Sequence, residues 1–196
     1  MIRLATPEDG AALAAIYDPI VASTAISFET EPPGPAEMGG RVASILQHAP
    51  WLVDDDGGVR GYAYASRHRE RAAYAWAVDA AVYVGAAFRR SGVGSRLYLK
   101  LFEILRLQGF IAVCAGITLP NAGSAGLHES LGFHPVGVYR GVGYKLGAWH
   151  DVLWLQLDLA PRAASPAPPF PGADARALWA RVLALAPAAP SGDTRR

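Results

Sequence analysis

The sequence predicts an α/β protein in which helices flank a β-sheet. Three features near the middle of the chain predict this class. An apolar run at 80–84, Ala-Ala-Val-Tyr-Val, is typical of a buried strand. Leucine and isoleucine then recur at helical spacing over 95–108, and 110–117 is again an apolar run. A strand, a helix and a second strand in succession exclude an all-helical or an all-β architecture.

A glycine-containing loop joins the first of these strands to the helix. Its residues 89–94 read Arg-Arg-Ser-Gly-Val-Gly. A loop of this kind at a helix start leaves several backbone N–H groups pointing at one place, where the helix dipole also favours negative charge. The loop lacks the third glycine of a dinucleotide fingerprint and the Gly-Lys-Ser/Thr of a P-loop. The pattern therefore predicts a different kind of pyrophosphate site.

Ahead of this centre we expect two helices and several strands. The first helix begins at Thr6, because a hydroxyl at the N-cap, a following proline and acids in the first turn favour a helix start. An apolar stripe continues it to about Ala22. The other expected elements are a strand at 2–5, a helix at 35–47, two hairpin strands at 51–53 and 59–65, and a central strand that Tyr74 and Trp76 begin and Val84 ends.

After the centre we expect a helix, two long strands and a tail. Gly109 should end the central helix. The next helix should start at Asn121 or Ser124 and end at Gly132, with strands following at 137–144 and 151–159. Beyond Ala160 the composition shifts to alanine and proline, with one short helix at 174–185 that carries a stripe of Leu178, Val182 and Leu185. We therefore expect one domain at 1–160 and a flexible tail at 161–196.

Charge and composition exclude several classes of protein. The chain of 196 residues has 18 basic and 17 acidic residues and a net charge of +1, so nothing directs it as a whole to nucleic acid or to an anionic membrane. The single cysteine, Cys114, lies in an apolar strand and is expected to be a buried hydrophobe. The N-terminus lacks the pattern of a signal peptide, and no apolar run approaches the roughly 20 residues of a membrane span. We expect a cytoplasmic protein.

Three segments, in this order and spacing, resemble the GNAT family of acetyl-CoA-dependent N-acetyltransferases. They are Val82-Tyr83-Val84, the Arg89-x-x-Gly92-x-Gly94 loop, and Asn121-x-x-Ser124 leading to Leu131-Gly132-Phe133. Segments at 28–32, 50–53, 109–110, 116–121 and 145–151 are similar to the phosphinothricin and methionine sulfoximine acetyltransferase branch. The resemblance covers roughly residues 1 to 160.

The resemblance implies a mixed, mostly antiparallel central sheet of about seven strands that is splayed at its centre. The pantetheine arm of acetyl-CoA would lie in the gap between the strands that carry Val84 and Ile117. A backbone N–H near Tyr83 or Val84 would stabilise the oxyanion. The residues implied for coenzyme binding are Val82, Tyr83, Val84, Arg89, Arg90, Ser91, Gly92, Val93, Gly94, Ser95, Asn121 and Ser124.

The branch implies acetylation of the α-amine of a small amino acid analogue, such as phosphinothricin, methionine sulfoximine or methionine sulfone. The branch has a glutamate as proton acceptor where this chain has Asp79. Because aspartate is one methylene shorter, relay through an ordered water becomes the expected route. A purely structural aspartate is the alternative. His128 matches a histidine of the branch and either assists proton transfer or caps and packs its helix.

Two arginines match basic residues that bind the acidic groups of the substrate in the branch. These are Arg69 and Arg71, which with Arg67 would point to one side if the segment is extended; a solvated rim is the alternative. Phe28 either forms a wall of the substrate pocket or packs on the first helix. The remaining candidates for the substrate pocket are Tyr74, Tyr83, Lys145 and Trp149.

The resemblance further implies a homodimer and no metal. The histidines at 48, 68, 128, 134 and 150 show no paired ligand spacing. Two other activities stay open at this point. One is acetylation of another amine, such as a protein N-terminus or a polyamine, although a polyamine site should be acidic. The other is binding of acetyl-CoA without turnover.

Overall fold

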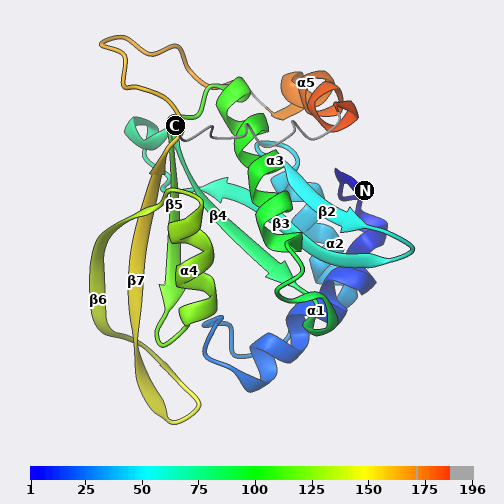
Figure 1. Cartoon of the computed structure of the whole chain (residues 1–196), viewed down its shortest axis with the longest axis vertical. Coiled ribbons are helices and arrows are strands. Elements are labelled where there is room, and N and C mark those ends of the chain that lie inside the picture. The colour runs from blue at the N-terminus through cyan, green and yellow to red at the C-terminus, as the bar shows by residue number, and fades with distance from the viewer. Residues whose placement is uncertain (171, 186–196) are drawn as a thin grey trace, which may run out of the picture.

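The computed structural model describes residues 1–170 and 172–185. Its strands form one seven-stranded sheet in the order β1-β2-β3-β4-β5-β7-β6 (Figure 1). Every neighbouring pair is antiparallel except β4 and β5, which are parallel. This confirms the mostly antiparallel sheet. The strands are β1 Ile2–Leu4, β2 Trp51–Asp55, β3 Val59–Arg67, β4 Ala77–Val84, β5 Ala112–Thr118, β6 His134–Lys145 and β7 Ala148–Asp158.

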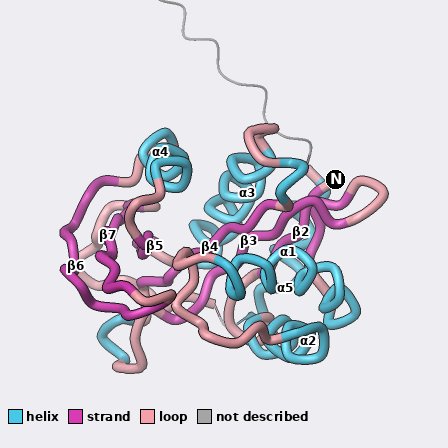
Figure 2. The backbone as a smooth tube through the Cα atoms, turned by 90° about the horizontal axis from the view of Figure 1, so that it is seen from below, coloured by secondary structure: helices cyan, strands magenta, loops and turns pink. Residues whose placement is uncertain are grey.

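Helices cover both faces of the sheet. Figure 2 shows α3 and α4 on one side of the sheet and α1 and α2 on the other. Within the described residues, no helix has the length and apolar character needed to span a membrane. The helices are α1 Gly10–Ser23, α2 Gly34–Ile45, α3 Val93–Gln108, α4 Ala122–Ser130 and α5 Gly172–Ala184, with short 3-10 turns at Pro7–Asp9, Ala72–Tyr74 and Ala86–Phe88.

The helix boundaries follow the capping residues. Thr6 precedes the first 3-10 turn and donates its N–H to the Asp9 carboxylate at 2.8 Å, so the predicted start is confirmed. The central helix begins at Val93, two residues earlier than predicted, after Gly92 at φ 79°. It ends at Gly109 in the left-handed conformation, as predicted. Asn121 caps α4 by accepting a hydrogen bond from the Ser124 N–H, which decides between the two predicted starts.

The prediction that Tyr74 and Trp76 begin the central strand is wrong. Tyr74 lies in a 3-10 turn, and β4 starts only at Ala77. The Trp76 indole donates a hydrogen bond to the Ala167 carbonyl at 2.8 Å, a contact 91 residues away in the sequence. A long-range contact therefore positions Trp76, and its strand propensity does not.

The sheet splits between β4 and β5. These two strands pair only where Ala77–Asp79 face Ala112–Cys114. Beyond that point β4 stays paired with β3 as far as Val84, and β5 stays paired with β7 as far as Thr118. The two halves of the sheet then diverge, as Figure 1 shows. The expected splay is confirmed, and one edge of β4 is left free beyond Asp79.

The C-terminal segment is not simply a flexible tail. The predicted helix exists as α5, but its buried stripe is Ala175, Trp179 and Val182 in place of the predicted one, since Leu185 is exposed. Trp179 is fully buried in the same core as α3, and its indole donates to the Gln108 side chain at 3.1 Å. The amide of that glutamine in turn donates to the Phe170 carbonyl at 2.8 Å. These contacts join the segment to the domain.

Candidate active site

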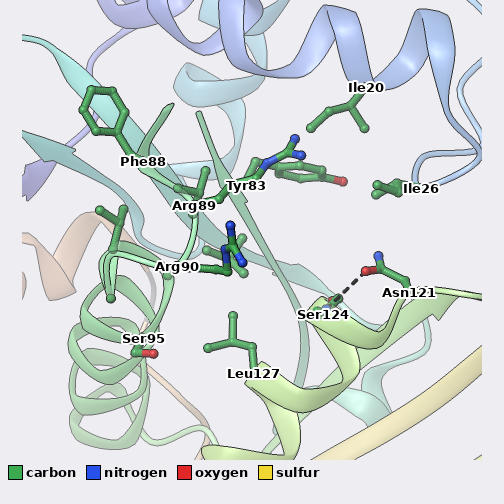
Figure 3. Close-up of a pocket in the computed structure, with 16 residues that line it drawn as sticks. Ile20, Ile26, Tyr83, Phe88, Arg89, Arg90, Ser95, Asn121, Ser124 and Leu127 are labelled. Carbon is green, nitrogen blue, oxygen red and sulfur yellow. Dashed lines mark hydrogen bonds between the residues drawn. The ribbon is translucent and has the colours of Figure 1, made fainter. Parts of the chain in front are cut away.

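A cavity of about 410 Å³ lies between the glycine loop and α4 (Figure 3). We call it the glycine-loop cavity. Figure 3 shows Arg89 and Arg90 across the cavity from Asn121 and Ser124. Every residue predicted for coenzyme binding lines it except Ser91. They are Val82, Tyr83, Val84, Arg89, Arg90, Gly92, Val93, Gly94, Ser95, Asn121 and Ser124. The sequence reasoning missed the apolar lining residues Ile20, Ile26, Phe88 and Leu127.

The loop backbone is shaped to present N–H groups. Arg90 and Gly92 both have positive φ, at 60° and 79°. Residues in this conformation beside a helix N-terminus form a concave row of N–H groups that suits an anion. Ser91 has a different task, because its hydroxyl donates to the Phe88 carbonyl at 2.6 Å. The hydroxyl therefore closes the loop, and coenzyme binding by Ser91 stays a prediction that concerns its backbone N–H.

A second, smaller space of about 60 Å³ occupies the split between β4 and β5. We call it the sheet gap. It shares Val82, Tyr83, Asn121 and Ser124 with the glycine-loop cavity. The two spaces therefore lie next to each other. The free edge of β4 beyond Asp79 offers unpaired backbone groups beside them.

His128 lines the sheet gap, but both of its ring nitrogens have protein partners. Nδ1 lies 2.7 Å from the Ser124 carbonyl oxygen, which can only accept, so this nitrogen carries the proton. Nε2 lies 3.1 Å from the Tyr98 hydroxyl. Burial lowers the pKa of His128, which keeps the ring neutral. This geometry favours the interpretation in which His128 caps and packs its helix.

Asp79 lies at the last paired position of β4, where the sheet begins to split. Its side chain is 30% exposed, and one carboxylate oxygen lies 2.7 Å from Nδ1 of His68. Burial raises the pKa of Asp79 and is the largest influence, while the hydrogen bond from His68 opposes it. A carboxylate with raised proton affinity beside a gap in the sheet can act as a proton acceptor.

The sequence reasoning missed His68. The β3–β4 register, which pairs Ser66 with Asp79, brings it to the carboxylate. Together with Cys114 it completes a group of three potential metal ligands within 4.8 Å of one another, which is the one such group among the described residues. Sequence spacing gave no sign of this group, because its members come from three separate segments.

Three arginines surround a further cavity of about 440 Å³, which we call the arginine cavity. Arg67, Arg69 and Arg71 all line it, although the chain bends after Arg67 and is not extended as the prediction required. The Arg69 guanidinium also lies 5.9 Å from the centroid of a Trp154 ring, over its face. Both Arg69 and Arg71 are exposed, so the structure brings them together without deciding between binding and a solvated rim.

A match over most of the domain shows the family of this chain. A family model described as an acetyltransferase (GNAT) domain matches residues 2–154. The chain belongs to the GNAT acetyltransferase family. The resemblance in the sequence is thus confirmed, and this GNAT protein is an N-acetyltransferase.

The relatives of this GNAT protein include enzymes with narrower names. A phosphinothricin N-acetyltransferase of Streptomyces viridochromogenes is 42% identical over 87% of this chain and 91% of its own length. An L-methionine sulfoximine/L-methionine sulfone acetyltransferase of Pseudomonas paraeruginosa is 37% identical over 84% of this chain and 98% of its own. A solved phosphinothricin acetyltransferase of Sinorhizobium meliloti in complex with acetyl-CoA has a TM-score of 0.81 at 33% identity, covering 85% of this chain and 92% of its own.

Two of the four aromatic residues predicted for the substrate pocket of this GNAT protein line a described cavity, and two do not. Tyr74 lines the arginine cavity, and Tyr83 lines the sheet gap with its ring packed edge-on against Tyr17 at 4.9 Å. Phe28 lines none of the four cavities described in this structure, and its ring lies against Gly143 of β6, where an added side chain would collide with it. Trp149 is 68% exposed and lines none of the four cavities described in this structure. The prediction of a pocket role for Trp149 is not supported.

Lys145 stabilises the fold through buried hydrogen bonds. The prediction that its side chain faces the substrate is therefore wrong. Its side chain is buried, and Nζ donates to the Val21 and Ser27 carbonyls, each at 2.7 Å. Burial lowers the pKa of Lys145. The lysine therefore connects α1 and the loop after it to the end of β6.

Replacing Lys145 with methionine is expected to lower the free energy of unfolding by about 1–3 kcal/mol, because two buried carbonyls lose their donor. Chemical denaturation measures this loss. Arg140→Met is the control, since among the described residues the exposed Arg140 forms an ion pair with Asp151 alone, and its loss should cost at most about 1 kcal/mol. Equal stability of the two variants would contradict the structural role of Lys145.

Proposed function

We propose that this protein transfers the acetyl group of acetyl-CoA to the α-amine of a small amino acid analogue of the phosphinothricin, methionine sulfoximine or methionine sulfone type. The split between β4 and β5, which begins at Asp79 and lies next to the glycine-loop cavity, is the observation that supports this most directly. The names of the relatives support the substrate class.

The residues of the glycine-loop cavity fit acetyl-CoA. The loop amides between Arg90 and Gly94 and the cations of Arg89 and Arg90 suit the phosphates. The free edge of β4 can hydrogen-bond the pantetheine amides as an added strand would. A backbone N–H near Tyr83 is the proposed oxyanion donor. The coenzyme supplies an activated acyl group, so the protein has only to bind, orient and remove a proton.

We place the acceptor on the side of the sheet gap that carries Asp79. An α-ammonium is mostly protonated near neutral pH, and only the free amine attacks a thioester, so a base is required. The carboxylate of Asp79 is part of the proposed base. Arg69 and Arg71 supply forked cations for a carboxylate, phosphinate or oxidised sulfur group. They also make the arginine cavity unsuitable for a polyamine. We propose direct attack of the amine on the thioester without a bound metal.

Consumption of the acetyl-CoA thioester, measured with several amines in parallel, tests the proposal. Phosphinothricin, methionine sulfoximine and methionine sulfone are expected to be acetylated, while spermidine and a peptide N-terminus are not. Faster turnover of spermidine or of the peptide would contradict the acceptor class. Binding of acetyl-CoA without turnover on any of these amines would favour a binding module over an enzyme.

Replacing Gly92 with alanine is expected to weaken acetyl-CoA binding about tenfold. The left-handed φ of 79° costs a non-glycine residue about 1–2 kcal/mol, and an added Cβ would lie 3.2 Å from the Arg96 guanidinium. The loop amides would then shift away from the phosphates. Calorimetry gives the dissociation constant. Gly40→Ala is the control, because the helical Gly40 has free space around it. Unchanged affinity of the Gly92 variant would contradict the phosphate role of this loop.

We also propose a homodimer of a cytoplasmic protein. The exposed edge of the sheet supports the dimer, because β6 has no partner on its outer side among the described strands. Large apolar side chains of β6, β7 and the turn between them are also exposed to solvent. Multi-angle light scattering tests this, and a monomer at micromolar concentration would contradict it. The exposed side chains are Val136, Tyr139, Val142, Tyr144, Leu146 and Trp149.

A further inference from the structure

We propose that His68 is a second catalytic residue: held by Asp79, its Nε2 atom accepts the proton of the substrate ammonium. This inference rests on the proposed acetyl transfer and deepens it. It replaces the ordered water that the shorter aspartate was expected to require with a side chain of this protein. Asp79 is then the residue that orients the imidazole and stabilises its protonated form.

The contact between the two side chains fixes the chemistry of the ring. An oxygen of the Asp79 carboxylate lies 2.7 Å from Nδ1 of His68. An ionised carboxylate can only accept a hydrogen bond, so Nδ1 carries the proton and Nε2 keeps its lone pair in the neutral ring. Within the described part of the chain, Nε2 has no hydrogen-bond partner. A carboxylate that orients an imidazole in this way makes the far nitrogen a general base.

The ring lies beside the point where the pairing of β4 with β5 ends. His68 lines a cavity of about 470 Å³ with Tyr74 and Cys114, which we call the His68 cavity. Tyr74 also lines the arginine cavity, so the two spaces adjoin. Cys114 is the strand partner of Asp79 at the point where the sheet splits. The imidazole thus extends the reach of the carboxylate toward the side on which the cations of Arg69 and Arg71 would hold an acidic amino acid.

Surrounding contacts hold the ring in place. The His68 side chain is only 16% exposed and packs edge-on against Tyr74 and Trp154, whose ring centroids lie 5.7 and 6.2 Å from that of the imidazole. The Arg69 guanidinium donates to the His68 carbonyl at 2.8 Å. A base that is held before the substrate arrives loses little entropy on reaction. The other titratable or charged groups around the pair are Tyr64, Arg69, Tyr74, Cys114 and Arg162.

The proton balance of the step is complete. The substrate ammonium gives one proton to Nε2 of His68, and the imidazolium that forms is stabilised by the Asp79 carboxylate before it releases the proton to water. The free amine forms a bond to the acetyl carbon, and the carbon–sulfur bond breaks. The second proton on nitrogen leaves in that step and ends on the thiolate of the leaving coenzyme. No oxidant, reductant or metal enters the step.

Exchange of His68 for asparagine tests the role directly. The side-chain amide of asparagine can replace the Nδ1–H donor to Asp79, but it offers no basic nitrogen. We expect kcat to fall about 100-fold or more with unchanged affinity for acetyl-CoA, because a positioned base contributes about 10²–10⁴-fold. His134→Asn, at an exposed histidine of β6, should keep full activity. If His68 only holds Asp79, the asparagine variant will keep most of its activity, and this outcome overturns the proposal.

Three further measurements test the role of His68 in other ways. Added imidazole should restore part of the turnover of His68→Ala but none of the turnover of Asp79→Ala, and the absence of rescue counts against the proposal. Nitrogen-15 NMR of the unliganded protein at neutral pH should show the Nδ1-protonated form of His68, with the preference lost in Asp79→Asn. The opposite tautomer in the wild type overturns the proposal without reference to turnover. Loss of wild-type activity with a chelator, and its recovery with Zn²⁺, would assign His68, Asp79 and Cys114 to a metal and also overturn it.

These readouts separate the inference from the proposed function. A wild-type protein that acetylates amino acids while His68→Asn does so equally well leaves the function intact and removes only the role of His68. A wild-type protein that acetylates no amine removes the function, while the tautomer still reports whether Asp79 orients the ring.

Discussion

Replacing Asp79 with asparagine is expected to lower kcat for amino acid acetylation about 10²–10⁴-fold, because the group that accepts the proton of the substrate ammonium loses the carboxylate on which it depends. Asparagine has nearly the same volume as aspartate, so the packing at the start of the split is kept. The change should not destabilise the fold near neutral pH. Burial raises the pKa of Asp79, so the folded state disfavours the carboxylate and loses nothing when the charge is removed.

The pH dependence of the wild-type enzyme provides a second test of the same residue. The base works only when the carboxylate is ionised, so activity should fall as the pH decreases through the raised pKa of Asp79. This loss should set in at a higher pH than an ordinary aspartate would give. Asp56→Asn is the matched control, because Asp56 is exposed on the β2–β3 turn and pairs with Arg60. An asparagine variant at position 79 with wild-type kcat would remove this carboxylate from the mechanism.

Replacing Trp179 with alanine is expected to lower the free energy of unfolding by about 3–5 kcal/mol. The indole is fully buried between α5 and α3, and it donates the hydrogen bond that Gln108 receives in the core. The variant would leave a cavity and also an unpaired acceptor. Urea denaturation followed by circular dichroism measures the loss, and the midpoint should fall without a change of secondary structure at zero denaturant.

Leu99→Ala is the control for this experiment. It removes a large apolar side chain from a position on α3 that is 58% exposed, and its effect on stability should stay within about 0.5 kcal/mol. If Trp179→Ala is equally harmless, α5 does not belong to the core and the segment after residue 160 behaves as the flexible tail that its composition predicts.

Much of this protein could be predicted from local patterns. Thr6 and Gly109 mark helix ends because their capping chemistry acts within a few residues. The glycine loop was predicted as an anion site because its unpaired amides are a property of the loop itself. Nearly all of the predicted coenzyme residues line one cavity, since they occupy three short segments, one at the end of β4 and two at helix starts.

The errors concern residues whose partners are distant in the sequence. The charge of Lys145 suggested a ligand for the substrate, but Val21 and Ser27, more than 100 residues away, take its hydrogen bonds. Trp76 carries a strand signal and yet is fixed by Ala167. Composition suggested a mobile end of the chain, but it does not reveal that Trp179 finds Gln108.

The sequence by itself determined the class of fold, the family and the loop that can hold a phosphate, because short segments and their spacing carry that information. Only the tertiary structure decided which side chain meets the carboxylate of Asp79. The register between β3 and β4 brings His68 to it, and the loss of pairing between β4 and β5 opens the sheet beside it. Register depends on how all the strands pack together, so no local pattern could reveal that contact.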